Sequence, residues 1–127
     1  MSRRLLLVDD EDAIREIARI SLERIGGWEV LAAASGADAV EAVQRKGTID
    51  AVLLDVMMPG LDGPSTMQAL RDGPLADEVP FVFLTAKLQS TDRQRLDALG
   101  AAGVIAKPFD PMQLPVQVSA LWDEAMT

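Results

Sequence analysis

The feature that most constrains the fold of this chain is a set of short, mostly apolar runs, each followed at once by a reactive side chain. Runs of this length, bounded by polar residues, are typical of buried strands. The reactive residues are Asp9 and Asp10 after residues 5–8, Asp55 after residues 49–54, Thr85 after residues 81–84, and Lys107 after residues 104–106. In an open parallel sheet, the carboxyl ends of the strands lie along the edge where such folds bind their ligands. The pattern therefore predicts that three carboxylates, a hydroxyl and an ammonium group converge on one site.

The segments between these runs carry the signals of helices. Asp12 is placed to cap the first helix, and Ser35, with an acid three residues later, is placed to cap the second. Pro64 suits the first turn of a third helix. Pro115 would remove a hydrogen bond from the interior of the last helix, so we expect that helix to start late or to bend.

Strand and helix alternate five times, if the run at residues 28–33 is counted as a further strand. This alternation predicts a five-stranded parallel sheet with helices on both faces, a doubly wound, flavodoxin-like α/β fold. Right-handed crossovers restrict the possible topologies, and we expect the strand order 2-1-3-4-5. At 127 residues and 13.7 kDa, the chain has the size of one domain. We expect residues 1–127 to form a single domain with no output domain.

Composition excludes several classes of function. The net charge of −8 and the pI near 4.4 argue against nucleic acid as a direct partner, because that binding depends on Lys and Arg at the phosphates. Arg3 and Arg4 are an isolated basic pair that we expect to be solvated. The chain has no Cys and no His, which excludes thiolate chemistry and a histidine base. No signal peptide or membrane span is evident, so we expect a soluble cytoplasmic protein with no membrane partner.

The charges at the predicted site point to phosphoryl chemistry. Asp9, Asp10 and Asp55 contribute −3 and Lys107 contributes +1, which leaves a net charge of −2. Two like charges 4 Å apart repel by about 4 kcal/mol at an effective dielectric constant of 20. A divalent cation would balance this charge, and oxygen ligands alone favour Mg²⁺, with Mn²⁺ possible. A cation, a lysine and a hydroxyl around a carboxylate would form a cradle for a phosphoryl group, and a carboxylate can be the covalent nucleophile.

Four strings in the chain together resemble the response-regulator receiver domain of two-component signalling. The match runs from about Arg4 to Trp122, and both order and spacing agree. The strings are Val8–Glu11, Leu54–Gly60, Leu84–Ala86 and Ala106–Phe109. The resemblance implies a stand-alone phosphoacceptor that signals by conformational change or relays the phosphoryl group. It implies no enzymatic activity beyond the chain's own phosphorylation and dephosphorylation.

The resemblance also assigns roles to individual residues. Asp55 would accept a phosphoryl group from a histidine kinase or a histidine phosphotransfer protein. Asp10 would bind Mg²⁺ directly, Asp9 would act largely through water, and the backbone carbonyl of Met57 would be a further ligand. Lys107 would pair with the phosphoryl oxygens. The downstream partner would be a protein that the sequence does not identify.

One position departs from the family and affects the expected switch. Thr85 would hydrogen-bond the phosphoryl group, and in the family an aromatic ring three residues before the lysine then swings inward. That position is Val104 here, which is short and stiff at χ1. We therefore expect the response to depend on the loop at residues 86–90 and on the fourth helix. The resemblance also implies a cis bond before Pro108.

Three other functions share features with this sequence. Asp10-Glu11-Asp12 also spells the D-x-D opening of haloacid-dehalogenase-type phosphatases, in which Asp10 would be the nucleophile; the chain lacks room for a cap domain. A flavodoxin would need a phosphate-binding loop where the chain has four consecutive acids. An interaction module that works without phosphorylation is disfavoured, because every reactive position is present.

Overall fold

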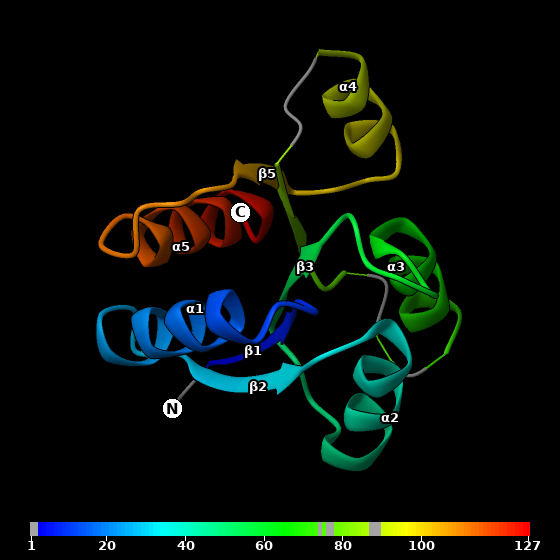
Figure 1. Cartoon of the computed structure of the whole chain (residues 1–127), viewed down its shortest axis with the longest axis horizontal. Helices are drawn as coiled ribbons and strands as arrows, with labels where there is room; N and C mark the ends of the chain where they lie inside the picture. The colour runs from blue at the N-terminus through cyan, green and yellow to red at the C-terminus, as the bar shows by residue number, and fades with distance from the viewer. Residues whose placement is uncertain (1–2, 74, 76–77, 87–89) are drawn as a thin grey trace.

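The computed structural model describes residues 3–73, 75, 78–86 and 90–127. Its strands form one parallel sheet in the order β2-β1-β3-β4-β5, which confirms the predicted order (Figure 1). The strands are β1 (Arg4–Val8), β2 (Glu29–Ala33), β3 (Ala51–Asp55), β4 (Phe81–Thr85) and β5 (Gly103–Ala106).

A helix follows each strand, as the alternation predicted. Figure 1 shows α1 beside α5 on one face of the sheet, and α2 and α3 on the other. The helices are α1 (Asp12–Arg24), α2 (Gly36–Lys46), α3 (Gly63–Asp72), α4 (Ser90–Ala98) and α5 (Leu114–Ala125). Within the described residues, none of them is long and apolar enough to cross a membrane.

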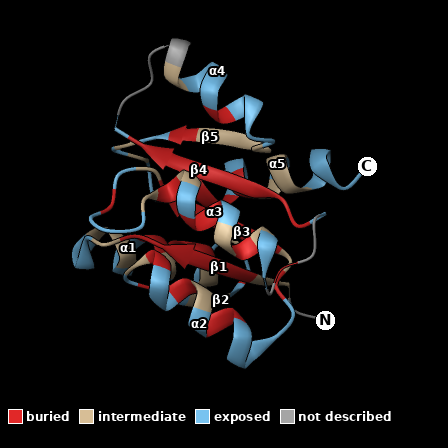
Figure 2. Ribbon diagram, turned by 90° about the vertical axis from the view of Figure 1, so that its right-hand side faces the viewer, coloured by how far each residue is buried: buried red, intermediate tan, exposed pale blue. Residues whose placement is uncertain are grey.

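Two apolar layers, one on each face of the sheet, form the core. Successive residues of a strand point to opposite faces, so Leu6 and Val8 belong to the layer under α2 and α3, whereas Leu5 and Leu7 belong to the other. Every residue of β3 and β4 is buried, and Figure 2 shows β4 as a continuous red arrow. Burial on both faces is expected of a parallel sheet covered by helices. Asp55 and Thr85 are therefore the last residues of strands that are buried along their whole length.

The start of α1 differs from the prediction. Asp12 is the first residue of the helix, and Glu11 occupies the capping position without a side-chain hydrogen bond to the helix. The Asp12 carboxylate instead pairs with Arg15, at 2.6 Å. Asp9 Oδ1 accepts a hydrogen bond from the Glu11 backbone N–H at 2.9 Å. The turn before the helix is therefore stabilised by one of the reactive carboxylates.

The starts of α2 and α5 agree with the prediction. Ser35 Oγ accepts a hydrogen bond from the Asp38 backbone N–H at 3.1 Å. The last helix begins at Leu114, which places Pro115 in its first turn. A proline there costs no helical hydrogen bond, because the first amides of a helix have no partner within it.

The prediction that Arg3 and Arg4 are merely solvated is wrong. The Arg3 guanidinium lies 4.1 Å from the ring centroid of Trp28 and 4.8 Å from that of Trp122. Arg4 pairs with Glu29 at 3.0 Å. These contacts join the first strand to β2 and α5 at the end of the sheet away from the reactive residues.

The close contact between Gly63 and the end of β3 generates a prediction. A Cβ atom at Gly63 would lie 2.5 Å from the Asp55 carbonyl oxygen and 2.8 Å from Val56 Cα, which are backbone atoms that cannot move cheaply. Gly63→Ala should therefore lower the free energy of unfolding by about 1–3 kcal/mol. Chemical denaturation measures this loss. Ser65→Ala, an exposed change in the same helical turn, is the control; an equal effect of both substitutions would contradict the packing argument.

Candidate functional site

The strand ends bring Asp9, Asp55, Thr85 and Lys107 to one edge of the sheet, as predicted. Asp55 is the last residue of β3 and Thr85 the last of β4, while Asp9 and Lys107 directly follow β1 and β5. Asp9 is fully buried, and Asp55 and Thr85 are each 3% exposed. Carboxylates are rarely this buried unless they are paired, so this edge is unusual chemically as well as geometrically.

Lys107 is the centre of the site. Its Nζ lies 2.8 Å from Asp9 Oδ2 and 3.2 Å from Asp55 Oδ2. Each of these three side chains is almost completely buried. A third carboxylate, that of Glu11, lies 3.7 Å away. One ammonium group thus faces two buried carboxylates and the exposed carboxylate of Glu11.

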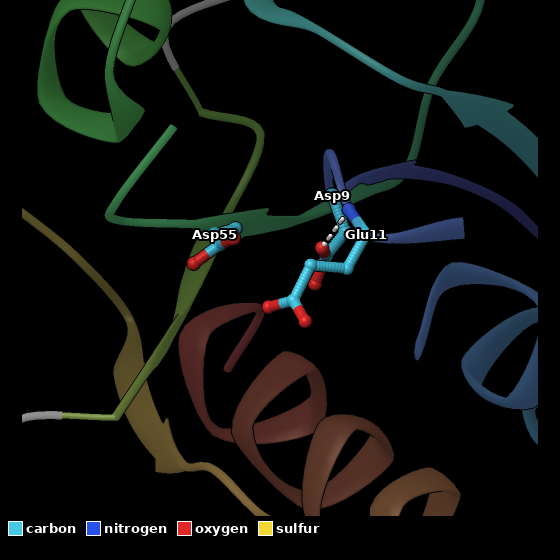
Figure 3. A group of neighbouring side chains, drawn as sticks. All are labelled: Asp9, Glu11 and Asp55. Atoms are coloured by element: carbon cyan, nitrogen blue, oxygen red, sulfur yellow. Dashed lines mark hydrogen bonds between the residues drawn. The ribbon is translucent and has the colours of Figure 1, made fainter. Parts of the chain in front are cut away.

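The same carboxylates could hold a metal ion. Asp9, Glu11 and Asp55 each offer an oxygen, and these oxygens lie within 4.8 Å of one another (Figure 3). Asp9 Oδ2 makes the ion pair with Lys107 but accepts no well-aligned hydrogen bond from the described residues, so it keeps lone-pair capacity. An all-oxygen, negatively charged donor set suits a hard cation such as Mg²⁺. The residues present therefore fit the ion that the sequence predicted.

The structure places Glu11, rather than Asp10, in this carboxylate group. The hydrogen bond from the Glu11 N–H to Asp9 brings the Glu11 side chain over the site, as Figure 3 shows. Asp10 is partly exposed and is not one of the three clustered acids. Four consecutive acids in the sequence gave no signal that favoured Glu11, because the choice depends on that local turn. Direct binding of Mg²⁺ by Asp10 stays a prediction.

The surroundings of Asp55 disfavour its negative charge. Burial raises the pKa of Asp55, and repulsion from Asp9 raises it further; Lys107 and a hydrogen bond from the Met57 N–H oppose these effects without cancelling them. Burial alone lowers the pKa of Lys107, but Asp9 and Asp55 outweigh it, so the net shift is upward. Lys107 therefore stays charged, and the site keeps an excess of negative charge.

The remaining predicted residues border the site. The Thr85 carbonyl accepts a hydrogen bond from the Lys107 N–H at 2.9 Å, and the bond between Lys107 and Pro108 is cis, as expected. Met57 is 60% exposed in the loop after Asp55. Val104 lies on β5 opposite Phe83 of β4 and packs against the core. Residues 87–89 of the loop that we expected to respond lie outside the described residues.

Comparisons with known proteins agree with this fold and site. The sequence matches the family described as the response regulator receiver domain over residues 5–119. It is 36% identical over 121 residues to the transcriptional regulatory protein SrrA of Staphylococcus aureus, which covers 95% of this chain and 48% of that protein. The chain thus spans about half the length of the curated relatives it matches.

Solved structures of receiver domains share the fold of this chain. The chemotaxis protein CheY4 of Vibrio cholerae superposes with a TM-score of 0.87 at 30% identity, covering 95% of this chain and 99% of that one. A CheY-like receiver domain protein of Methanospirillum hungatei, at 24% identity and a TM-score of 0.82, covers 99% and 98% and shares the fold. The chain belongs to the response regulator receiver domain family.

The raised pKa of Asp55 generates a prediction about stability. The folded state binds a proton at Asp55 more tightly than the unfolded state, so the ionised carboxylate destabilises the fold above that raised pKa. Asp55→Asn should therefore raise the melting temperature of the metal-free protein at pH 7. The difference from wild type should shrink as the pH falls through the raised pKa, because wild-type Asp55 then also becomes neutral.

Thermal unfolding in chelator over a series of pH values measures this difference. Asp123→Asn removes an exposed carboxylate of α5 and is the matched control. A wild type that is more stable than Asp55→Asn at pH 7 would show that the pairing with Lys107 outweighs burial and repulsion, contrary to our account.

Proposed function

We propose that this receiver domain accepts a phosphoryl group on Asp55 from a phosphohistidine donor, in a reaction that requires Mg²⁺. The observation that carries the proposal is the position of Asp55 Oδ2, which lies 3.2 Å from Lys107 Nζ and within the carboxylate group of Asp9 and Glu11. An Asp55 oxygen would attack phosphorus while the bond from phosphorus to the imidazole nitrogen breaks. The imidazole leaves with the electron pair of that bond, and the product is an aspartyl phosphate.

The residues around Asp55 supply position and charge rather than a base. Lys107, already beside Asp55, can follow the phosphoryl oxygens as charge develops on them. The Thr85 hydroxyl, at the end of the next strand, can donate a hydrogen bond to the phosphoryl group. Because a carboxylate is deprotonated before it attacks, the absence of histidine from the chain is consistent with this reaction.

Mg²⁺ is proposed on the same carboxylates. Asp9, Glu11 and Asp55 would hold the ion, with Asp10 and the Met57 carbonyl as the further ligands that the family resemblance implies. When bound, the cation would neutralise charge on the phosphoryl oxygens and on the carboxylates. The chain's own contribution is to hold these acids close together beside Lys107.

A protein phosphodonor is supported by the surface next to the site. Ile17 and Ile20 of α1 are 48% and 40% exposed, and Ile25, just after the helix, is 47% exposed. Together with Pro111 from the segment after Lys107 they line an apolar hollow. Since α1 begins directly after Glu11, Ile17 is the isoleucine nearest the site along the helix, and a partner docked there would extend toward the phosphoacceptor.

The output of the whole protein is also a proposal. The relative SrrA is named a transcriptional regulatory protein. For this chain, the charge of −8 argues against direct contact with nucleic acid by the receiver domain itself. We propose a protein as the downstream target and the cytoplasm as the location, in keeping with a signalling role.

Phosphorylation of Asp55 is tested by incubation with acetyl phosphate or phosphoramidate followed by intact-mass and peptide mass spectrometry. Wild type should gain one phosphoryl group in Mg²⁺ and none in chelator. Asp55→Asn should gain none. Label that is kept by Asp55→Asn and lost from Asp10→Asn would favour the phosphatase-like chemistry at Asp10. Comparing Asp10→Asn with Glu11→Gln, through the Mg²⁺ concentration needed for labelling, identifies which acid binds the ion.

Docking on α1 is tested by Ile17→Asp. A charge at this exposed position should slow transfer from a phosphorylated histidine phosphotransfer domain by about tenfold or more, the size typical of a lost contact at the centre of an interface. Labelling by phosphoramidate, which has the same phosphorus–nitrogen bond, should not change. Met126→Asp, at an exposed apolar residue beyond α5, is the control. Equal loss with both donors would mean that the substitution damages the site and not the docking surface.

A further inference from the structure

A small cavity lies between α4 and residues that border the phosphoacceptor site. It has a volume of about 150 Å³ and is lined by Val56, Met57, Thr85, Asp92, Arg95 and Leu96. Ligand pockets usually measure about 300–1,000 Å³, so this cavity suits a phosphoryl oxygen, a few waters or the end of a side chain better than a separate small molecule. Its walls are the loop after Asp55, the switch residue Thr85 and one face of α4.

Arg95 is the positive side chain on this face of α4. It lines the cavity and also a second hollow, formed by the same loop together with Met58, Pro59 and Asp62. Arg95 thus shares both hollows with Val56 and Met57 of the loop after Asp55. The side chain is exposed, and within the described part of the chain it makes no ion pair or hydrogen bond. It can therefore turn toward a new negative charge without breaking such an interaction.

Phosphorylation would supply that charge. Asp9, Glu11 and Asp55 contribute −3 and Lys107 +1, and a phosphoryl group on Asp55 would add further negative charge at the end of β3. Arg95 pairs well with phosphate groups, since its planar guanidinium can donate two parallel hydrogen bonds. Asp92, one turn earlier on the same helix, also lines the cavity.

The attachment of α4 allows it to respond. Among its described side chains only Leu96 is buried, and the others are partly or fully exposed. The carboxyl end is held from α3, because Arg71 donates a hydrogen bond to the Leu99 carbonyl at 3.3 Å and stacks over Phe81. The helix is therefore fixed at one end and weakly packed along its length, so a modest force can tilt it.

We propose that Arg95 is a positioning residue: attraction between its guanidinium group and phosphorylated Asp55 draws α4 toward the site. Arg95 thus transmits the response for which the side chain of Val104 is too short. The proposal rests on phosphorylation of Asp55, as proposed above. In the phosphorylated state Arg95 turns into the cavity beside Thr85, and α4 tilts about its anchor at Leu99. The signal reaches the outer surface through a charge on α4 instead of through an aromatic ring on β5.

The test is a set of backbone NMR spectra with and without Mg²⁺ and beryllofluoride, which mimics the phosphoryl group. In wild type, the amides of residues 92–99 should shift together with those near Asp55 and Lys107. Arg95→Gln should lose most of the shifts in residues 92–99, keep those near Asp55, and still gain label from acetyl phosphate. Arg95→Lys, which keeps the charge, should restore much of the α4 response. Arg93→Gln, on the same helix but outside the cavity, is the matched control.

Because the proposed response of α4 depends on the charge of Arg95, it should also depend on the salt concentration. The α4 response of wild type should weaken as ionic strength rises, because an exposed arginine is screened, while the shifts near Asp55 should not. Shifts in residues 92–99 of Arg95→Gln that equal those of wild type would overturn the proposal and leave phosphorylation of Asp55 intact. Loss of the response in Arg95→Lys as well would also overturn it, because charge would then not be the cause. A wild type that gains no label and shows no shift near Asp55 would overturn the proposed function itself.

Discussion

Lys107 and the two buried carboxylates beside it are the interaction on which the rest of the structure depends. Burying one ammonium group with Asp9 and Asp55 has a desolvation cost of several kcal/mol per ion, and a lost partner would leave an uncompensated buried charge. The parallel sheet positions both carboxylates, because Asp9 directly follows β1 and Asp55 is the last residue of β3, which is buried throughout. The hydrogen bond from the Lys107 N–H to the Thr85 carbonyl positions the lysine backbone beside β4.

The same arrangement leaves the site with more negative charge than it can neutralise. Burial and Asp9 raise the pKa of Asp55, and Lys107 only partly offsets them. A site in this condition gains from a divalent cation, and the cation in turn makes the approach of a phosphoryl donor less repulsive. Under the proposed function, the raised pKa of Asp55 and the binding of a cation would have one physical cause, the excess of negative charge. It also explains why an exposed arginine on α4 could sense the change in charge from outside the carboxylate group.

Most of the fold could be predicted from the sequence, because each strand is a short apolar run and each helix begins or ends at a recognisable residue such as Ser35 or Gly47. The convergence of Asp9, Asp55, Thr85 and Lys107 followed from the topology alone. The position of Glu11 could not be predicted, since it depends on a hydrogen bond between its own backbone and Asp9. The contacts of Arg3 with two tryptophan rings could not be predicted either, because those rings come from distant segments of the chain.

The most direct test of this account is a ¹³C NMR titration of the Asp55 carboxyl group, with and without Mg²⁺. In the metal-free protein we predict a pKa above the ordinary value for an aspartate, because burial and Asp9 outweigh Lys107. Saturating Mg²⁺ should lower it, since the cation stabilises the carboxylate. An Asp55 pKa at or below the ordinary value in the metal-free protein, unchanged by Mg²⁺, would contradict the claim that excess negative charge prepares this site for a cation and a phosphoryl group.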